Sequence, residues 1–177
     1  MTHDSNAILL KAWLLKHYNK LSKVLDEVTV NREESILGSL RHIIDTEEDA
    51  GILVPVVRAY FRIKRAHLVD CRPLFEVATT EKYAVKEALL EVLGYDRMVP
   101  TSEEQERIIN TFFHFGQGLD LRSRTDPRYG LAAACAGWDP VLVKPFLLHC
   151  LHLPDAPLKH VASKALKQQY TKLRGTK

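Results

Sequence analysis

Apolar residues recur every three or four positions along most of the chain, which is the spacing of an amphipathic helix. This pattern predicts helices over about residues 6–28, 31–44, 50–65, 73–77, 80–93, 102–115, 127–134, 140–152 and 157–172. The alternation of apolar and polar residues that marks a strand is nearly absent. We therefore expect an all-α fold of roughly nine helices with short connections.

Several of the expected helix ends carry residues with defined capping roles. Asp126-Pro127 and Asp139-Pro140 each offer an Asp at the N-cap and a Pro at the first helical position, where the missing N–H costs nothing. Gly94 and Gly116 are expected to end helices, because glycine readily adopts the left-handed backbone of a C-terminal cap. Pro55 must lie in the first turn of its helix or kink it.

Residues 147–166 form the most informative stretch: an apolar helix, a short turn around Asp155, and a second helix with small residues on one face. A pair of helices of this kind cannot cover its own apolar stripe, so it must stack on neighbouring pairs. The pattern favours a helical repeat array, which presents an extended surface for binding.

Three stretches resemble the second helix of a HEAT repeat, which begins Asp-Pro-x-x-apolar-Arg and continues with small and apolar residues. They are residues 155–166, 83–94 and 126–134, although Gly130 replaces the expected cation in the last of these. The apolar anchors Val85, Tyr129 and Leu158 are 44 and then 29 residues apart, whereas HEAT repeats recur every 40–47 residues or so. The resemblance covers about the last 110 residues.

The resemblance implies a single domain over residues 1–177, folded as a short right-handed α-solenoid of about four stacked helix pairs. It also implies a scaffold that binds a protein partner without catalysis, although a fold alone does not determine function. The partner and the oligomeric state are left open.

Composition agrees with an ordinary globular protein. The chain is 46% hydrophobic and 27% charged, and it contains no apolar run of about 18 residues, so we expect no transmembrane helix. The first residues lack a basic region that would mark a signal peptide. The three cysteines, Cys71, Cys135 and Cys150, form an odd and widely spaced set. This set favours reduced thiols and a cytoplasmic location.

Charge is unevenly distributed. Residues 26–49 contain eight acids and two bases, a net charge of −6, and residues 121–177 contain ten bases and three acids, a net charge of +7. Such asymmetry can steer an acidic partner to one end, or allow two copies to associate, but it also describes solvated helix faces.

Three groups of cations are candidate partner contacts. Arg58, Arg62 and Arg65 form a helical stripe that can bind carboxylates or phosphates, and a solvated face is the alternative. A second stripe consists of His160, Lys164, Lys167, Thr171 and Arg174, and the polar outer face of a terminal repeat is the alternative. The third group surrounds a helix N-terminus, where an anion can bind, or belongs to an exposed linker; it consists of Arg122, Arg124 and Arg128.

Residue patterns for chemistry are weak. His149 and His152, with Cys150 between them and Asp155 beyond, suggest a metal, but a structural zinc site needs four convergent ligands. Cys150 falls at an apolar core position and is expected to be an inert buried thiol. We therefore expect no catalytic residue, cofactor or metal.

Two alternatives to a protein-binding scaffold remain. The first is nucleic-acid binding through a basic concave groove, with contacts mainly to the phosphate backbone. The second is an enzyme similar to DNA glycosylases with HEAT-like folds, for which Trp138 and Asp139 would be the relevant pair. Asp139 is better explained as a helix cap. The other tryptophan, Trp13, lies on an apolar helix and is better explained as a core residue.

Overall fold

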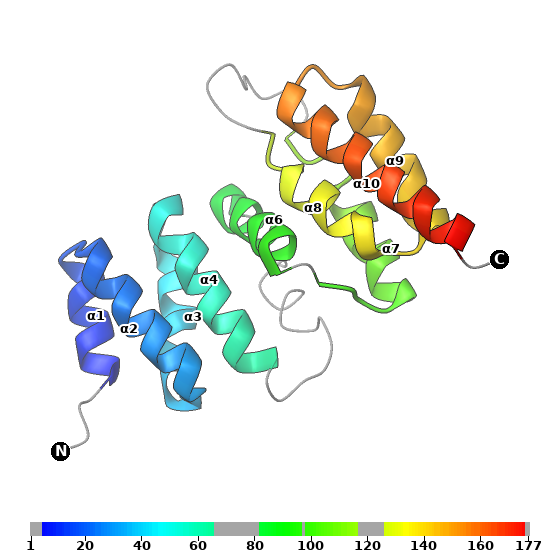
Figure 1. Ribbon diagram of the computed structural model, residues 1–177. Helices are drawn as coiled ribbons and strands as arrows, with labels where there is room; N and C mark the ends of the chain where they lie inside the picture. Colours follow the sequence, from blue (N-terminus) through cyan, green and yellow to red (C-terminus); the bar gives the residue numbers. More distant parts are fainter. Residues whose placement is uncertain (1–4, 66–81, 97, 117–125, 176–177) are drawn as a thin grey trace. The chain divides into compact units, whose positions relative to one another are not determined.

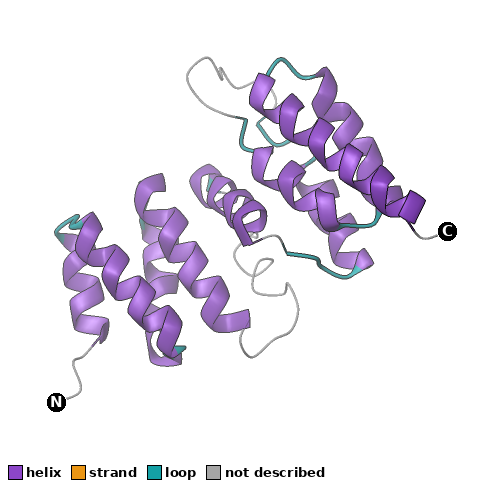
Figure 2. Cartoon of the chain, viewed as in Figure 1, coloured by secondary structure: helices purple, strands orange, loops and turns teal. Residues whose placement is uncertain are grey.

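The structure is a computed structural model that describes residues 5–65, 82–96, 98–116 and 126–175. All regular secondary structure within these ranges is helical, as expected, with nine α-helices and two short 3-10 helices (Figure 2). The chain divides into two compact units, residues 1–89 and 90–177. The expected short helix at residues 73–77 lies outside the described residues.

The first unit contains two helix pairs in succession (Figure 1). The helices α1 and α2 pack on each other, as do α3 and α4, and α2 also packs on α4. The second helices of the two pairs are therefore neighbours. The elements are α1 (Ser5–Leu14), α2 (Tyr18–Asn31), the 3-10 helix η1 (Glu34–Ile36), α3 (Leu37–Thr46) and α4 (Ala50–Arg65).

The single helix expected over residues 6–28 is wrong, because the chain reverses between Leu14 and Tyr18. Lys16 has a φ of 52°, and its amide and that of His17 donate back to carbonyls of α1. This is the hydrogen-bond pattern of a helix C-terminal cap in the left-handed conformation, which glycine normally supplies. The apolar period continues through the turn, so periodicity alone did not reveal the break.

The acidic turn after α3 connects the second pair, as the sequence predicts. Glu47 is extended and ends α3. The carboxylate of Asp49 then accepts a hydrogen bond of 2.8 Å from the Gly51 amide at the start of α4. Pro55 lies in the second turn of α4, inside the helix, rather than in the first turn.

The second unit has a similar order of packing. The helices α9 and α10 form a pair, α8 packs on α10, and α7 packs on α9 (Figure 1). The elements are α7 (Ser102–Phe112), α8 (Tyr129–Ala134), the 3-10 helix η2 (Cys135–Gly137), α9 (Pro140–His152) and α10 (Ala156–Gly175). The helix α6 (Tyr83–Asp96) contains the division between the two units.

Capping in the second unit follows the sequence in most places. Asp139 accepts from the Val141 amide at 2.8 Å, with Pro140 at the start of α9, as expected. Thr101 and Glu104 form a reciprocal capping box at the start of α7. Asp126 instead precedes a turn, and α8 begins at Tyr129, two residues later than the expected start.

The role expected for Gly94 is wrong. The helix α6 continues to Asp96, and Gly94 lies inside it with Gly130 of α8 directly opposite. Glycine is required there because the two backbones approach too closely for a side chain. Gly116 does have a positive φ, 77°, beyond the end of α7.

Among the described residues, no helix combines the length and the apolar character needed to cross a membrane.

Candidate partner-binding surfaces

Arg58 and Arg62 line a shallow hollow between α2 and α4. The hollow has a volume of about 60 Å³, and we call it the α2–α4 groove. Arg58 is half-buried and Arg62 is exposed. The side chain of Arg65 lies outside the described part of the structure. The full lining is Ser22, Leu25, Asp26, Thr29, Pro55, Arg58, Ala59 and Arg62.

The α2–α4 groove combines charged, hydroxyl and apolar groups. Its α2 side carries the exposed carboxylate of Asp26 and the hydroxyls of Ser22 and Thr29. Its α4 side carries the two arginines. A volume of about 60 Å³ is well below the several hundred Å³ of a small-molecule site. The groove can therefore accept a side chain or a carboxylate from a partner.

The second stripe of cations lies on α10. His160, Lys164, Lys167 and Thr171 are all exposed, while Ala165 is buried behind them. The exposure of the two lysine candidates matches their expected place on the outer face. The side chain of Arg174, expected to extend this stripe, lies outside the described residues.

The third candidate group, Arg122, Arg124 and Arg128, differs most from the expectation. Arg122 and Arg124 lie outside the described residues. Arg128 is only 2% exposed, so it is not the surface contact that we expected. Its guanidinium pairs with Asp126 at 2.7 Å and donates to the Phe113 carbonyl at 3.1 Å. A buried cation is retained when paired and hydrogen-bonded, and this pair fixes the turn before α8.

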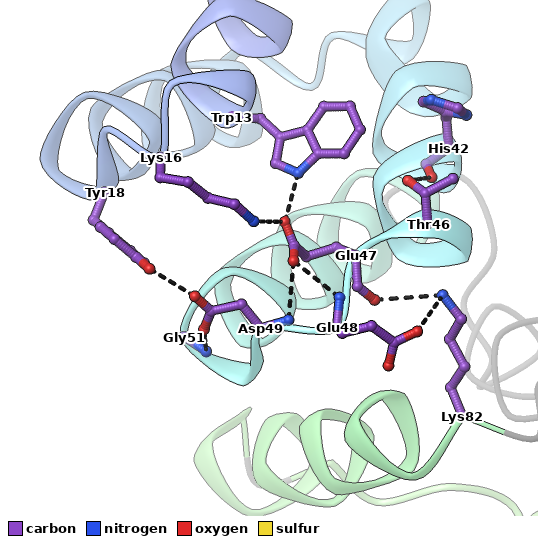
Figure 3. Close-up of polar contacts among 10 residues, drawn as sticks. All are labelled: Trp13, Lys16, Tyr18, His42, Thr46, Glu47, Glu48, Asp49, Gly51 and Lys82. Carbon is purple, nitrogen blue, oxygen red and sulfur yellow. Dashed lines mark hydrogen bonds and ion pairs between the residues drawn. The ribbon is translucent and has the colours of Figure 1, made fainter.

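The pattern-based search missed a polar cluster around Glu47, which is only 7% exposed (Figure 3). Its carboxylate forms an ion pair with Lys16 and accepts from the Trp13 indole at 2.7 Å. It also accepts from the backbone amides of Glu48 and Asp49 at 2.9 and 3.0 Å. Trp13 is thus partly buried as a hydrogen-bond donor as well as a packing residue.

The Glu47 cluster is saturated by contacts within the chain. Burial raises the pKa of Glu47, but the hydrogen bonds from Lys16, Asp49, Trp13 and Glu48 outweigh burial and lower it to about 2. The neighbouring Glu48 pairs with Lys82 at 3.3 Å. Because the carboxylate lone pairs are already used, this cluster joins the two helix pairs and does not offer a ligand site. The sequence marks this place only by the acidic run at residues 47–49, which does not reveal the donors Trp13 and Lys16.

His149, one of the two histidines considered for a metal site, packs among aromatic rings. His149 stacks on Phe113, with ring centroids 4.8 Å apart, and its ring centroid is 5.9 Å from that of His114. Burial, followed by Arg128 and His114, lowers the pKa of His149. Within the described residues, no three His, Cys, Asp or Glu side chains are placed to hold a metal ion.

The other candidates for chemistry are engaged inside the fold. Trp138 is 3% exposed and donates to the Met98 carbonyl at 2.6 Å, while Asp139 caps α9. Cys135 and Cys150 are buried free thiols, and burial raises the pKa of Cys150 to about 12. Cys150 is therefore the unreactive buried thiol that its apolar context predicts.

In comparisons with known proteins, no family model, no curated protein and no solved structure matches the chain.

Proposed function

We propose that this chain is a non-enzymatic, HEAT-like helical repeat module that binds a protein partner through the α2–α4 groove. The packing order supports a repeat: in the first unit the pair α1/α2 stacks on the pair α3/α4 through α2 and α4, and in the second unit α10 of the pair α9/α10 packs on α8. Stacked pairs cover each other's apolar faces in this way. The proposal includes a right-handed solenoid of about four pairs and a cytoplasmic location, to which the reduced thiols are suited.

The observation that carries the proposed function is the composition of the α2–α4 groove. Arg58 and Arg62 of α4 line this groove together with Asp26 and the hydroxyl-bearing Ser22 and Thr29 of α2, and the apolar Leu25 also contributes to the lining. Arginine is enriched at protein interfaces because its planar fork binds carboxylates with two hydrogen bonds. Asp26 supplies an acceptor for a partner's donor, so the groove can fix the orientation of a bound segment.

The two alternatives receive less support from these residues. A nucleic-acid site formed by the Arg58 stripe and the Arg122–Arg128 loop would need Arg128 as a phosphate contact. The guanidinium of Arg128 instead binds Asp126 and the Phe113 carbonyl inside the fold. A glycosylase-like site would need Trp138 and Asp139 to contact a base. Trp138 instead forms a buried hydrogen bond, and Asp139 caps a helix.

The proposed function is tested by affinity capture with the full chain as bait. Arg62→Glu reverses a charge in the groove at an exposed position, and Lys23→Glu makes the same change at an exposed position of α2 that does not line it. We expect a partner that the native chain and Lys23→Glu retain but Arg62→Glu loses. Equal retention by both variants would exclude the groove as the main contact. Circular dichroism establishes that both variants are folded.

A further inference from the structure

The last helix pair is cationic to a degree that the rest of the chain is not. The helices α9 and α10, over residues 140–152 and 156–175, contain no acidic residue at all. Between them lies Asp155, whose carboxylate accepts from the amides of Leu158 at 2.6 Å and Asp126 at 3.1 Å. The carboxylate in the connection between α9 and α10 is therefore occupied by these two amides.

Three lysines of α10 have no acidic partner among the described residues. Lys159, Lys164 and Lys167 are exposed, and none forms an ion pair with another described side chain. The first unit is different, because its acidic turn pairs with cations of neighbouring elements, such as Glu47 with Lys16 and Glu48 with Lys82. Unpaired lysines on one face create a positive potential that attracts an anionic partner.

The geometry of this face suits a linear array of charges. His160, Lys164, Lys167 and Thr171 recur at intervals of three and four residues and therefore lie along one side of the helix. At about 1.5 Å per residue, the row extends over about 16 Å. Each strand of duplex DNA carries about one phosphate charge per 3.4 Å of axis, so the row is long enough to meet several successive phosphates.

The residue types on this face distinguish a polyanion from a protein partner. Protein interfaces are enriched in arginine and aromatic residues around an apolar centre and are depleted in lysine. The described members of the α10 row are lysine, histidine and threonine, and none of them is an apolar anchor. Lysine is a point charge that suits the phosphate backbone without reading sequence.

We propose that the exposed lysine face of α10 binds the phosphate backbone of a nucleic acid, without sequence specificity. This binding site is separate from the α2–α4 groove, so the two proposals can fail independently. Non-specific binding of this kind has a dissociation constant of about 1–100 μM at physiological salt and weakens steeply as salt rises.

The test is fluorescence anisotropy of the full chain with a labelled 24-base-pair duplex and with one of its strands alone. Lys164→Gln together with Lys167→Gln removes two charges from the α10 face. The matched control, Lys20→Gln with Lys23→Gln, removes two exposed charges from α2. We expect the α10 variant to bind about tenfold more weakly, and its slope of log K against log salt to fall by about two for the duplex.

The duplex and the single strand distinguish the two sources of phosphate backbone, and binding of either one supports the proposal. Absence of binding to both probes at 50 mM salt would overturn it. Equal weakening by the α10 and α2 variants would also overturn it, since binding would then follow net charge rather than this face. A labelled polyglutamate peptide is the third probe: if it binds through Lys164 and Lys167 while both nucleic acids do not, the face recognises an acidic protein instead. Thermal unfolding confirms that the variants are folded.

Discussion

Gly94 of α6 and Gly130 of α8 lie so close that a β-carbon built on Gly94 would be 2.7 Å from the α-carbon of Gly130. A β-carbon on Gly130 would overlap the carbonyl oxygen of Leu90. Neither neighbour is the end of a flexible side chain, so a larger residue forces backbone to move. The contact therefore sets the distance between these two segments of the second unit.

Gly130→Ala is expected to lower the free energy of unfolding by about 3 kcal/mol, at the upper part of the range for overpacking. The control is Gly38→Ala, because a β-carbon at Gly38 in α3 meets nothing within 4 Å. That substitution should raise stability by about 0.4–1 kcal/mol, since alanine restricts the unfolded chain. Urea unfolding monitored by circular dichroism measures both. A neutral Gly130→Ala would contradict the close approach.

Glu47→Gln should lower stability at pH 7 by about 1–3 kcal/mol, because a buried charged acceptor of four hydrogen bonds is lost. The folded pKa of Glu47, about 2, lies below the ordinary 4.5. Its stabilising contribution is therefore complete above about pH 4.5 and is lost as pH falls toward 2. The native chain and the variant should converge over this interval.

The control for Glu47 is Glu27→Gln, an exposed position on α2. This variant should follow the native chain at every pH. A constant difference between the native chain and Glu47→Gln from pH 7 to pH 2 would show that ionisation of Glu47 does not stabilise the fold.

Arg128→Met should destabilise the fold by about 3–5 kcal/mol, because it leaves the carboxylate of Asp126 buried without its cation. Combining it with Asp126→Asn should recover part of the loss, since no uncompensated charge then remains. Urea titrations of both variants provide the measurement. If Arg128→Met has native stability but loses a partner, Arg128 is a surface contact after all.

The stability of the second unit should decrease under mild acid because of His149. Burial, then Arg128, His114 and His152, lower its folded pKa below the ordinary 6.5, and Asp126 opposes them weakly. Its contribution is present above about pH 6.5 and is lost as pH falls toward the folded pKa, because the unfolded chain takes up the proton first. His149→Phe should flatten the melting temperature between pH 7 and pH 5.

His160→Gln, at an exposed position of α10, is the comparison for His149. It should leave the pH dependence of the native chain unchanged. An unaltered slope in His149→Phe would assign the acid sensitivity to other groups.

Cys135 and Cys150 should react with iodoacetamide at pH 8 about a hundredfold more slowly in the native chain than in urea. Burial raises the pKa of both thiols, for Cys150 to about 12, and the thiolate is the reactive form. Peptide mass spectrometry resolves the two sites. Fast labelling of either thiol in the native state would show that its helix opens readily.

Periodicity was sufficient to locate several of the helices. The expected helices at residues 50–65, 102–115 and 140–152 correspond to α4, α7 and α9. The same signal failed at Lys16, because the apolar period runs unbroken through a left-handed turn that carries no glycine. Gly94 was wrongly assigned to a helix end, because a single sequence does not distinguish a glycine that caps a helix from a glycine that allows two helices to approach closely.

The candidate site was predictable only in part. The exposure of Arg62, Lys164 and Lys167 follows from their position opposite the apolar stripes. The burial of Arg128 does not, because it depends on Asp126 two residues earlier and on the Phe113 carbonyl contributed after α7. The burial and hydrogen bonding of Glu47 were missed for the same reason, because its donors Trp13 and Lys16 are more than thirty residues away in the sequence.

Arg32, with a φ of 53°, ends α2 in the same left-handed form in which Lys16 ends α1. Its amide and that of Glu33 reach back to the carbonyls of Thr29 and Val28. A peptide tag inserted at either corner would break these hydrogen bonds, so both corners are poor insertion points for protein engineering. Replacing Arg32 with glycine would relieve the conformational cost at that corner, and it offers a simple route to a more heat-resistant variant.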